Sequence, residues 1–381
     1  MTDVNAHLHT PWSFSAFRDI SQALDMAAQQ GVKVVGINDF YTTEGYAEWV
    51  EGCRQRRLYP LLGIEMIALS AAERDAGVRV NDPNNPGRTY ISGKGLNYPV
   101  TLGGAQARML ASVRAETQKQ VSLMCSRLNE HLCKVGAGFS LDFLRIEKEL
   151  SLGQVRERHL ARALRLAVEV RTGGGAEGLS PARAEALAGD PDSASKELYS
   201  RIFGAAPKAD PADPAAIENE IRSRLLKAGG AAFVPESPGA FLPVEAVCDI
   251  IRAAGGVPTY PFLADNSEGG FTDFEADLQR AADSLRGKGI RSVEFITTRN
   301  STAVLESYAS YLEDEGFTVS FGSEHNTPSM EPLLLRTRDS AALSDRLRAI
   351  NWRGACAIAA HQAGADSPDA GETIINQAIN L

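Results

Sequence analysis

The chain has 381 residues, of which 44% are hydrophobic and 23% charged, and its formal net charge is −9 with a pI near 5.3. The length allows one large or two modest domains, and the acidic balance argues against a broad nucleic-acid-binding surface. Five cysteines scattered without CxxC spacing indicate reduced thiols instead of disulfides or a zinc cluster. With no charged-then-apolar leader and no long apolar run, we expect a soluble cytoplasmic protein without a membrane segment.

The first hundred residues alternate between helix and strand patterns. In chain order we expect a helix over 19–31, a strand over 32–39, a helix over 42–57 and a strand over 58–69. Strand and helix alternating at this spacing predict parallel βαβ units, and therefore an α/β sheet or barrel. In such a fold, residues at the C-terminal ends of the strands form the active site.

The middle of the chain differs in composition from both ends. Residues 71–104 are rich in Gly, Pro and Asn, which predicts a long functional loop. Residues 105–228 are rich in Ala, Leu, Arg and Glu with helical periodicity, which predicts a helical insertion over 105–239. The α/β pattern resumes at about 240. We therefore expect a discontinuous α/β domain over 1–104 and 240–381, whose last helices, over 330–381, complete it.

Two histidines lie one residue apart in the run "NAHLHTPWSFSAF", at His7 and His9. Side chains at positions i and i+2 point the same way on an extended backbone, so both can face one ligand. Further polar residues follow predicted strands: Asp39, Glu65, Tyr260, Glu294, Glu324, His325 and Asn326. Carboxylates and imidazoles gathered from several strand ends favour a divalent metal site. The alternative is a set of ordinary polar residues that binds nothing.

Several motifs resemble those of the polymerase and histidinol phosphatase (PHP) superfamily of metal-dependent hydrolases. The matching segments are "HLHTPWS", "VGINDF", "GIE" over 63–65, "AGGVPTYP" and "FGSEHN". The segments "RERHLARAL", "ELYSRIFG" and "PVEAVCDIIRAAGG" are similar to the helical cap of one branch, the small phosphoesterases that act on nucleoside 3′,5′-bisphosphates and RNA 5′ ends. The resemblance implies a distorted (β/α)7 PHP-type barrel with a helical cap insertion over 105–239.

The departures from this family pattern change the expected metal content. Phe40, Tyr260 and Asn326 stand where the family has histidines, and a phenylalanine cannot bind a metal. The resemblance therefore implies one metal ion instead of three, either Zn²⁺, Mn²⁺ or Fe²⁺. The implied ligands are His7, His9, Glu65 and Glu324, with His325 as an alternative ligand if the strand end shifts by one residue. We expect Asp39 to accept a hydrogen bond from an imidazole N–H.

Other side chains are candidates for catalysis or substrate binding. Lys94 has glycine neighbours that would let an anion approach, although it could equally be a solvated loop lysine. Tyr260 could act as a general acid or pack in the core, and His159 could reach an anion or pack in a helix. The complete expected sets are catalytic Lys94, Tyr260 and His325, and substrate-binding Arg88, Lys94, Arg158, His159 and Asn326.

The sequence is consistent with three functions. The first is a metal-dependent phosphoesterase acting on a small anionic substrate such as a nucleotide or sugar phosphate, with nucleic acid bound only as a short end. The second is a single-metal enzyme of another class, either a C–N or C–O hydrolase or a lyase or isomerase for a sugar-like substrate. The third is a non-catalytic binding protein. Loss of metal ligands favours the second function, and the cap segments favour the first.

Overall fold

The computed structural model describes residues 1–173, 191–266, 270–365 and 367–380. The chain forms two compact units, an α/β unit of residues 1–113, 241–326 and 330–381 and a helical unit of residues 114–240 and 327–329. None of the helices in the described ranges is both long and apolar enough to cross a membrane.

Seven strands form one sheet in the α/β unit. They are β1 (Asp3–Leu8), β2 (Val32–Phe40), β3 (Tyr59–Leu69), β4 (Arg88–Lys94), β5 (Val257–Phe262), β6 (Ser292–Ile296) and β7 (Thr318–Gly322). The strands lie in sequence order. β4 runs antiparallel to β3 and β5, whereas the other neighbouring strands are parallel.

The segment expected to be a long loop over 71–104 contains regular structure, so that prediction is wrong. It includes the short helix α3 (Ala71–Asp75) and strand β4. Its Gly and Pro residues are typical of a loop, whereas a strand is recognised in a sequence mainly by alternating apolar and polar residues. β4 is buried along most of its length, and its small residues Ser92 and Gly93 hide that alternation.

The sheet is nearly closed into a barrel, because the segment after β7 returns to β1. A parallel bridge joins Leu8 to Glu324, and the N–H of His9 donates to the carbonyl of Glu324 over 2.8 Å. Gly322 permits this approach, since a Cβ there would lie 2.2 Å from Cβ of His7. Asn351 spans the seam, accepting from the N–H of Phe321 and donating to the carbonyl of Val4.

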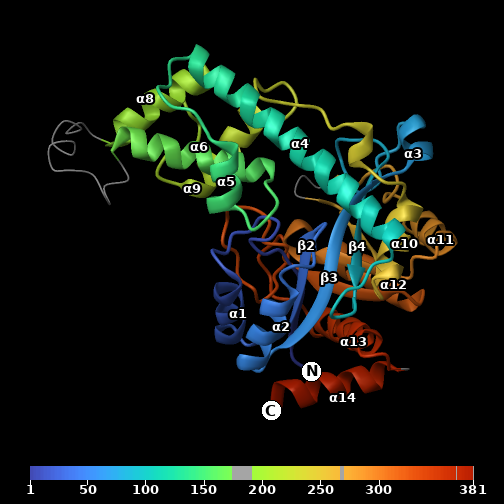
Figure 1. Cartoon of the computed structure of the whole chain (residues 1–381). Helices are drawn as coiled ribbons and strands as arrows, with labels where there is room; N and C mark the ends of the chain where they lie inside the picture. Colours follow the sequence, from blue (N-terminus) through green and yellow to red (C-terminus); the bar gives the residue numbers. More distant parts are fainter. Residues whose placement is uncertain (174–190, 267–269, 366, 381) are drawn as a thin grey trace. The chain divides into compact units, whose positions relative to one another are not determined.

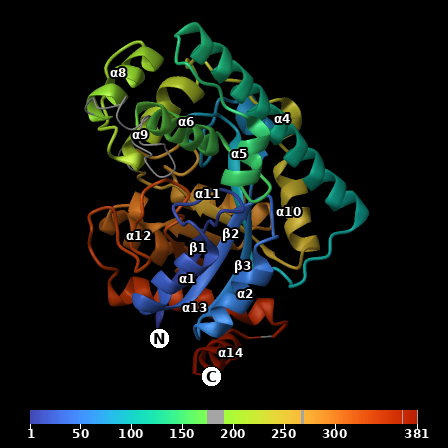
Figure 2. The same cartoon turned by 60° about the vertical axis from the view of Figure 1, so that its left-hand side comes forward.

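Helices cover the outside of this sheet (Figures 1 and 2). They are α1 (Ile20–Gln29), α2 (Tyr46–Gln55), α10 (Val244–Ala253), α11 (Leu278–Gly287), α12 (Thr302–Asp314), α13 (Asp345–Gln362) and α14 (Pro368–Asn380). α13 and α14 lie beside the beginning of β1 in both views. Apolar residues of α13 pack there on Val4 and Ala6, so the last helices form part of the α/β unit.

The helical unit has its own hydrophobic core. The long helix α4 (Gly104–Lys134) enters it, and α5 (Phe143–Leu150), α6 (Glu157–Thr172), α8 (Pro191–Phe203) and α9 (Pro214–Ile221) follow. Side chains such as Leu128, Leu160 and Ile202 are fully buried in this core. Asp142 and Asp213 cap α5 and α9 by accepting backbone N–H groups. In the described part of this unit all regular elements are helical.

Candidate metal centre

Four side chains from three parts of the barrel meet at one point inside it. His7 lies on β1, His9 directly after it, Glu65 on β3 and Glu324 after β7. One donor atom from each lies within 4.8 Å of the other three, and all four residues are buried. The parallel strands β1 and β3 and the closure of the barrel bring together residues that are more than 300 positions apart in the sequence.

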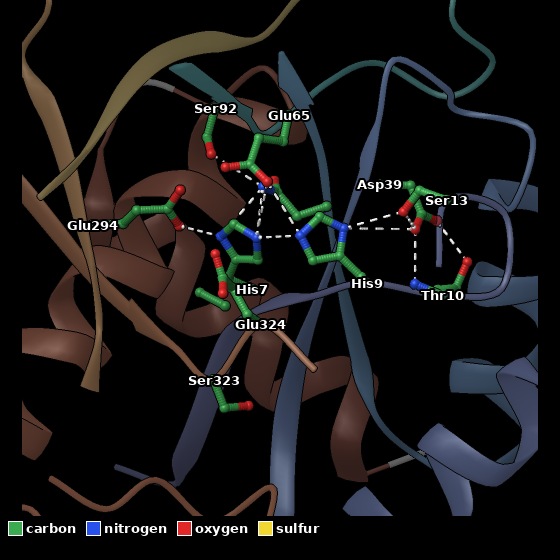
Figure 3. A network of polar contacts seen from close by, with 12 residues as sticks. His7, His9, Thr10, Ser13, Asp39, Glu65, Ser92, Glu294, Ser323 and Glu324 are labelled. Carbon is green, nitrogen blue, oxygen red and sulfur yellow. Dashed lines mark hydrogen bonds and ion pairs between the residues drawn. The ribbon is translucent and has the colours of Figure 1, made fainter. Parts of the chain in front are cut away.

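The orientation of His7 is fixed on both sides of its ring. Nδ1 lies 3.0 Å from Glu294 Oε2, and Nε2 lies 3.2 Å from Nε2 of His9. Figure 3 shows His7 between these two residues. Because an ionised carboxylate only accepts hydrogen bonds, the proton is assigned to Nδ1 and Nε2 keeps its lone pair.

The outer nitrogen of His9 is held by a serine and an aspartate. Nδ1 lies 3.1 Å from Ser13 Oγ, and Ser13 Oγ donates to Asp39 Oδ1 over 2.7 Å. Asp39 itself is 4.0 Å from Nδ1, too far for a hydrogen bond. The expected direct contact between Asp39 and an imidazole is therefore wrong, because Ser13 lies between them. Thr10 orients Asp39 further through its N–H and hydroxyl groups.

These contacts direct Nε2 of His7 and Nε2 of His9 toward each other and toward one carboxylate oxygen of Glu65. Nε2 of His9 lies 3.1 Å from Glu65 Oε2, and Nε2 of His7 lies 3.8 Å from the same oxygen. Glu65 Oε2 is buried, and apart from these histidine nitrogens it has no hydrogen-bond partner within the described ranges. The amide nitrogen of Asn38 is 3.3 and 3.2 Å from the two ring nitrogens of His7, so it is not in line with either lone pair. Converging acceptors of this kind fit a divalent cation.

The carboxylates at this point differ in their tendency to ionise. Burial raises the pKa of Glu65 to about 8; His7 acts to lower this pKa, and the neighbouring charges of Glu324 and Glu294 act to raise it. Burial also acts to raise the pKa of Glu324, but Arg299 and then both histidines hold it below its usual value. For Glu294 the effects of His7 and Lys94 outweigh burial and lower the pKa.

Lys94 is enclosed in the barrel instead of lying in a loop. Its ammonium group donates to Glu294 Oε2 at 2.7 Å, to the carbonyl of Ala6 at 2.9 Å and to Asn38 Oδ1 at 3.2 Å. The side chain is 1% exposed. All three N–H groups of the ammonium thus have acceptors inside the protein. Lys94 is therefore not a solvated loop lysine, and it places a fixed positive charge beside Glu294.

Two further candidates for catalysis face other partners. The hydroxyl of Tyr260 donates to Glu275 Oε1 over 2.8 Å, and its ring packs in the hydrophobic core. His325 lies 2.9 Å from Ser323 Oγ through Nδ1 and 2.8 Å from the carbonyl of Glu331 through Nε2, and it stacks on Phe17. The backbone is left-handed at both Glu324 and His325, with φ values of 63° and 57°, and the His325 ring contacts Ser323, Glu331 and Phe17. Neither Tyr260 nor His325 forms a described side-chain hydrogen bond with His7, His9, Glu65 or Glu324.

The remaining candidates for substrate binding are also engaged elsewhere. Arg88 lies over the ring of Phe241 and 3.6 Å from Asp82, at the end of β4 opposite Lys94. In the helical unit, Arg158 donates to Asn219. His159 is buried at the start of α6, where Nδ1 accepts the N–H of Arg156, and burial lowers the pKa of His159 to about 3. Asn326 follows His325 and is half-buried.

Sequence reasoning missed three residues around the centre. Ser13 was part of the histidine motif but had no assigned role, and Asn38 precedes Asp39 on β2. Arg299 lies just beyond β6, in the 3-10 turn Thr297–Arg299, and its guanidinium forms an ion pair with Glu324. A survey of cations at the strand ends, in addition to histidines and acids, would have identified Arg299. Phe40, meanwhile, stacks on the ring of His9 with a centroid distance of 4.9 Å.

Two solved structures share the fold. An amidohydrolase from Chromobacterium violaceum, which holds sulfate and no metal, is 16% identical, with a TM-score of 0.56 over 91% of this chain and 96% of that chain. A proposed metal-dependent phosphoesterase from Bifidobacterium adolescentis is 15% identical, with a TM-score of 0.57 over 92% of this chain and 95% of that chain. No protein-family model and no curated protein matches the sequence. The chain thus has an α/β fold shared with proteins described as hydrolases.

Proposed function

We propose that this protein is a metal-dependent hydrolase of the PHP type that uses one divalent ion to hydrolyse a small phosphorylated substrate. The observation that carries the proposal is the convergence of His7, His9, Glu65 and Glu324, whose donor atoms lie within 4.8 Å of one another. The outer nitrogens of both histidines are engaged by Glu294 and Ser13. Histidines held in this way by outer partners are typical of metal sites.

The residues present suit one divalent cation better than several. Two imidazoles and two carboxylates are a common ligand set for Zn²⁺, Mn²⁺ or Fe²⁺. Lys94 and Arg299 already pair with Glu294 and Glu324, so less negative charge is left to attract further cations. When bound, a divalent ion would supply Lewis acidity that polarises a substrate oxygen and acidifies water. Asp39, whose pKa burial raises to about 6, would hold His9 in place through Ser13.

A phosphorylated substrate is supported by the sequence resemblance to capped phosphoesterases and by the structural neighbours. One neighbour is described as a proposed metal-dependent phosphoesterase, and the other holds sulfate, an anion with the tetrahedral shape of phosphate. The second candidate is C–N bond hydrolysis, because the sulfate-bound neighbour is described as an amidohydrolase. Both reactions would use the same ligands.

Metal analysis followed by a substrate screen tests the proposal. Protein purified without added metal should contain about one equivalent of Zn, Mn or Fe per chain. The metal-loaded protein should release phosphate from nucleotides or sugar phosphates, whereas turnover of amides alone would establish the second candidate. A protein that holds no metal after growth in metal-supplemented medium contradicts the proposal. Metal binding without turnover in either screen would instead indicate a binding protein.

A further inference from the structure

Besides the proposed metal ion, a side-chain cation can contact an anionic substrate, and most of the side-chain cations expected from the sequence have other partners. Lys94 is buried with three acceptors, Arg88 lies over Phe241, and Arg158 donates to Asn219. The centre also contains the carboxylates of Glu294 and Glu324, which repel an anion and are paired with Lys94 and Arg299. A side-chain cation that remains open to solvent would add to the attraction that the proposed metal ion exerts on an anion.

Arg299 is placed to supply that charge. Its guanidinium pairs with Glu324 Oε2, so it is directly adjacent to a proposed metal ligand. The Arg299 side chain is 39% exposed, whereas that of Glu324 is 10% exposed. A guanidinium has five N–H donors in a planar fork that suits phosphate and carboxylate oxygens. The ion pair with Glu324 leaves several of these donors for a ligand.

The backbone that carries Arg299 is held firmly. The next residue, Asn300, is buried and donates to the carbonyl of Leu263 over 2.8 Å. Arg338 donates to the carbonyl of Arg299 over 2.9 Å and pairs with Asp265 at 2.7 Å. A cation on a fixed backbone loses less conformational freedom when a ligand binds than a cation on a mobile loop.

We infer that Arg299 binds an oxyanion of the substrate, a phosphoryl or carboxylate group, next to the metal centre. This inference rests on the proposed function, because it places the substrate's anionic group beside Glu324. It assigns recognition of the anion to a residue of the barrel itself. Arg299 would contact Glu324 and the substrate at the same time, so one side chain would link the ligand set to the bound anion.

The test measures binding of inorganic phosphate to metal-loaded protein by calorimetry. Arg299→Gln removes the charge at similar size, Arg299→Lys keeps the charge but not the fork, and Arg353→Gln alters an exposed arginine that pairs with Glu313 on the surface. We expect Arg299→Gln to weaken phosphate binding about 10- to 100-fold, the range for hydrogen bonds to charged groups, while one metal per chain is retained. Arg299→Lys should lose less phosphate affinity than Arg299→Gln, and Arg353→Gln should bind phosphate as tightly as the wild type.

Several results would overturn the inference. They are unchanged phosphate binding in Arg299→Gln, no phosphate binding by the metal-loaded wild type, and loss of metal from both Arg299 variants. The last result would make Arg299 a positioning residue for Glu324. A wild type that binds no metal would instead refute the proposed function. Phosphate titrations of the metal-free wild type and Arg299→Gln would then still decide whether Arg299 binds an anion.

Discussion

Lys94 Nζ lies 2.7 Å from Glu294 Oε2 inside the barrel, and the two side chains are 1% and 0% exposed. The same carboxylate oxygen lies 3.0 Å from Nδ1 of His7. A buried lysine thus stabilises the charge of the carboxylate that orients a proposed metal ligand. This arrangement gives the lysine a role in the interior that its glycine-flanked sequence did not suggest.

Removing the charge of Lys94 should destabilise the protein strongly. Lys94→Met leaves the carboxylate of Glu294 buried without its cation, and breaking a buried pair in this way costs about 3–5 kcal/mol in the free energy of unfolding. The double variant Lys94→Met/Glu294→Gln should recover part of this loss, because no unpaired charge remains. Denaturant unfolding of metal-free protein measures both effects. Arg353→Met, which breaks a surface pair with Glu313, is the control, and an equal cost for the two single variants would contradict the prediction.

His9→Ala should remove the metal and the activity together. One of the four converging ligands is lost, and Nε2 of His7 loses the neighbour that lies 3.2 Å away. Metal content by mass spectrometry and thermal unfolding with and without chelator are the measurements. Chelator should lower the Tm of the wild type and leave that of His9→Ala unchanged, since only a bound ion adds stability. His361→Ala, which alters an exposed histidine in contact with the carbonyl of Gly255, should keep its metal.

Ser13→Ala should weaken metal binding without abolishing it. The hydroxyl connects His9 Nδ1 to Asp39, and loss of such an outer partner typically costs 10–100-fold in metal affinity. Competition with a chromophoric chelator gives the affinity of wild type and variant. Ser126→Ala removes an exposed helix hydroxyl that donates to the carbonyl of Ser122 and serves as the control. An unchanged affinity in Ser13→Ala would show that Asp39 does not act on His9 through this serine.

Stability should fall as the pH rises from about 5 to 8, in part because of Glu275. This buried carboxyl accepts from Tyr260 and from the N–H groups of Leu263 and Ala264, yet burial raises its pKa from 4.5 to about 8. The folded state therefore keeps a proton that the unfolded chain releases above pH 4.5. The resulting stability is lost as the pH approaches 8, by up to about 3–5 kcal/mol.

Glu275→Gln isolates this contribution, because an amide does not titrate. The decrease in unfolding free energy between pH 5 and 8 should be smaller in the variant, as measured by urea unfolding of metal-free protein. A residual decrease is expected from Asp39 and Glu65, whose pKa values burial also raises. Glu51→Gln is the control, since Arg54 and Gln55 lower the pKa of this exposed glutamate and it titrates below the range. If the unfolding free energy decreases equally in Glu275→Gln and in the wild type between pH 5 and 8, Glu275 does not cause the pH dependence.

The sequence predicts an element well where the residues of that element carry the pattern themselves. The strand expected over 58–69 corresponds to β3 (Tyr59–Leu69), and the helix expected over 19–31 to α1 (Ile20–Gln29), where Asp19 caps the first turn. β4 was missed because its small, buried residues show no alternation. Its antiparallel pairing also depends on β3 and β5, which the local pattern cannot reveal.

The sequence by itself determined that strands and helices alternate, and that histidines and carboxylates follow several strands. It predicted His7, His9, Glu65 and Glu324 as ligands, because strand ends of one sheet share an edge, and that assignment stays a prediction. Only the tertiary structure decided the partners of the remaining side chains. Lys94 is enclosed with Glu294, Ser13 separates Asp39 from His9, and Arg299 pairs with Glu324. The physical reason is that a side chain's position along the chain sets its strand and face, whereas barrel closure sets which distant charges it meets.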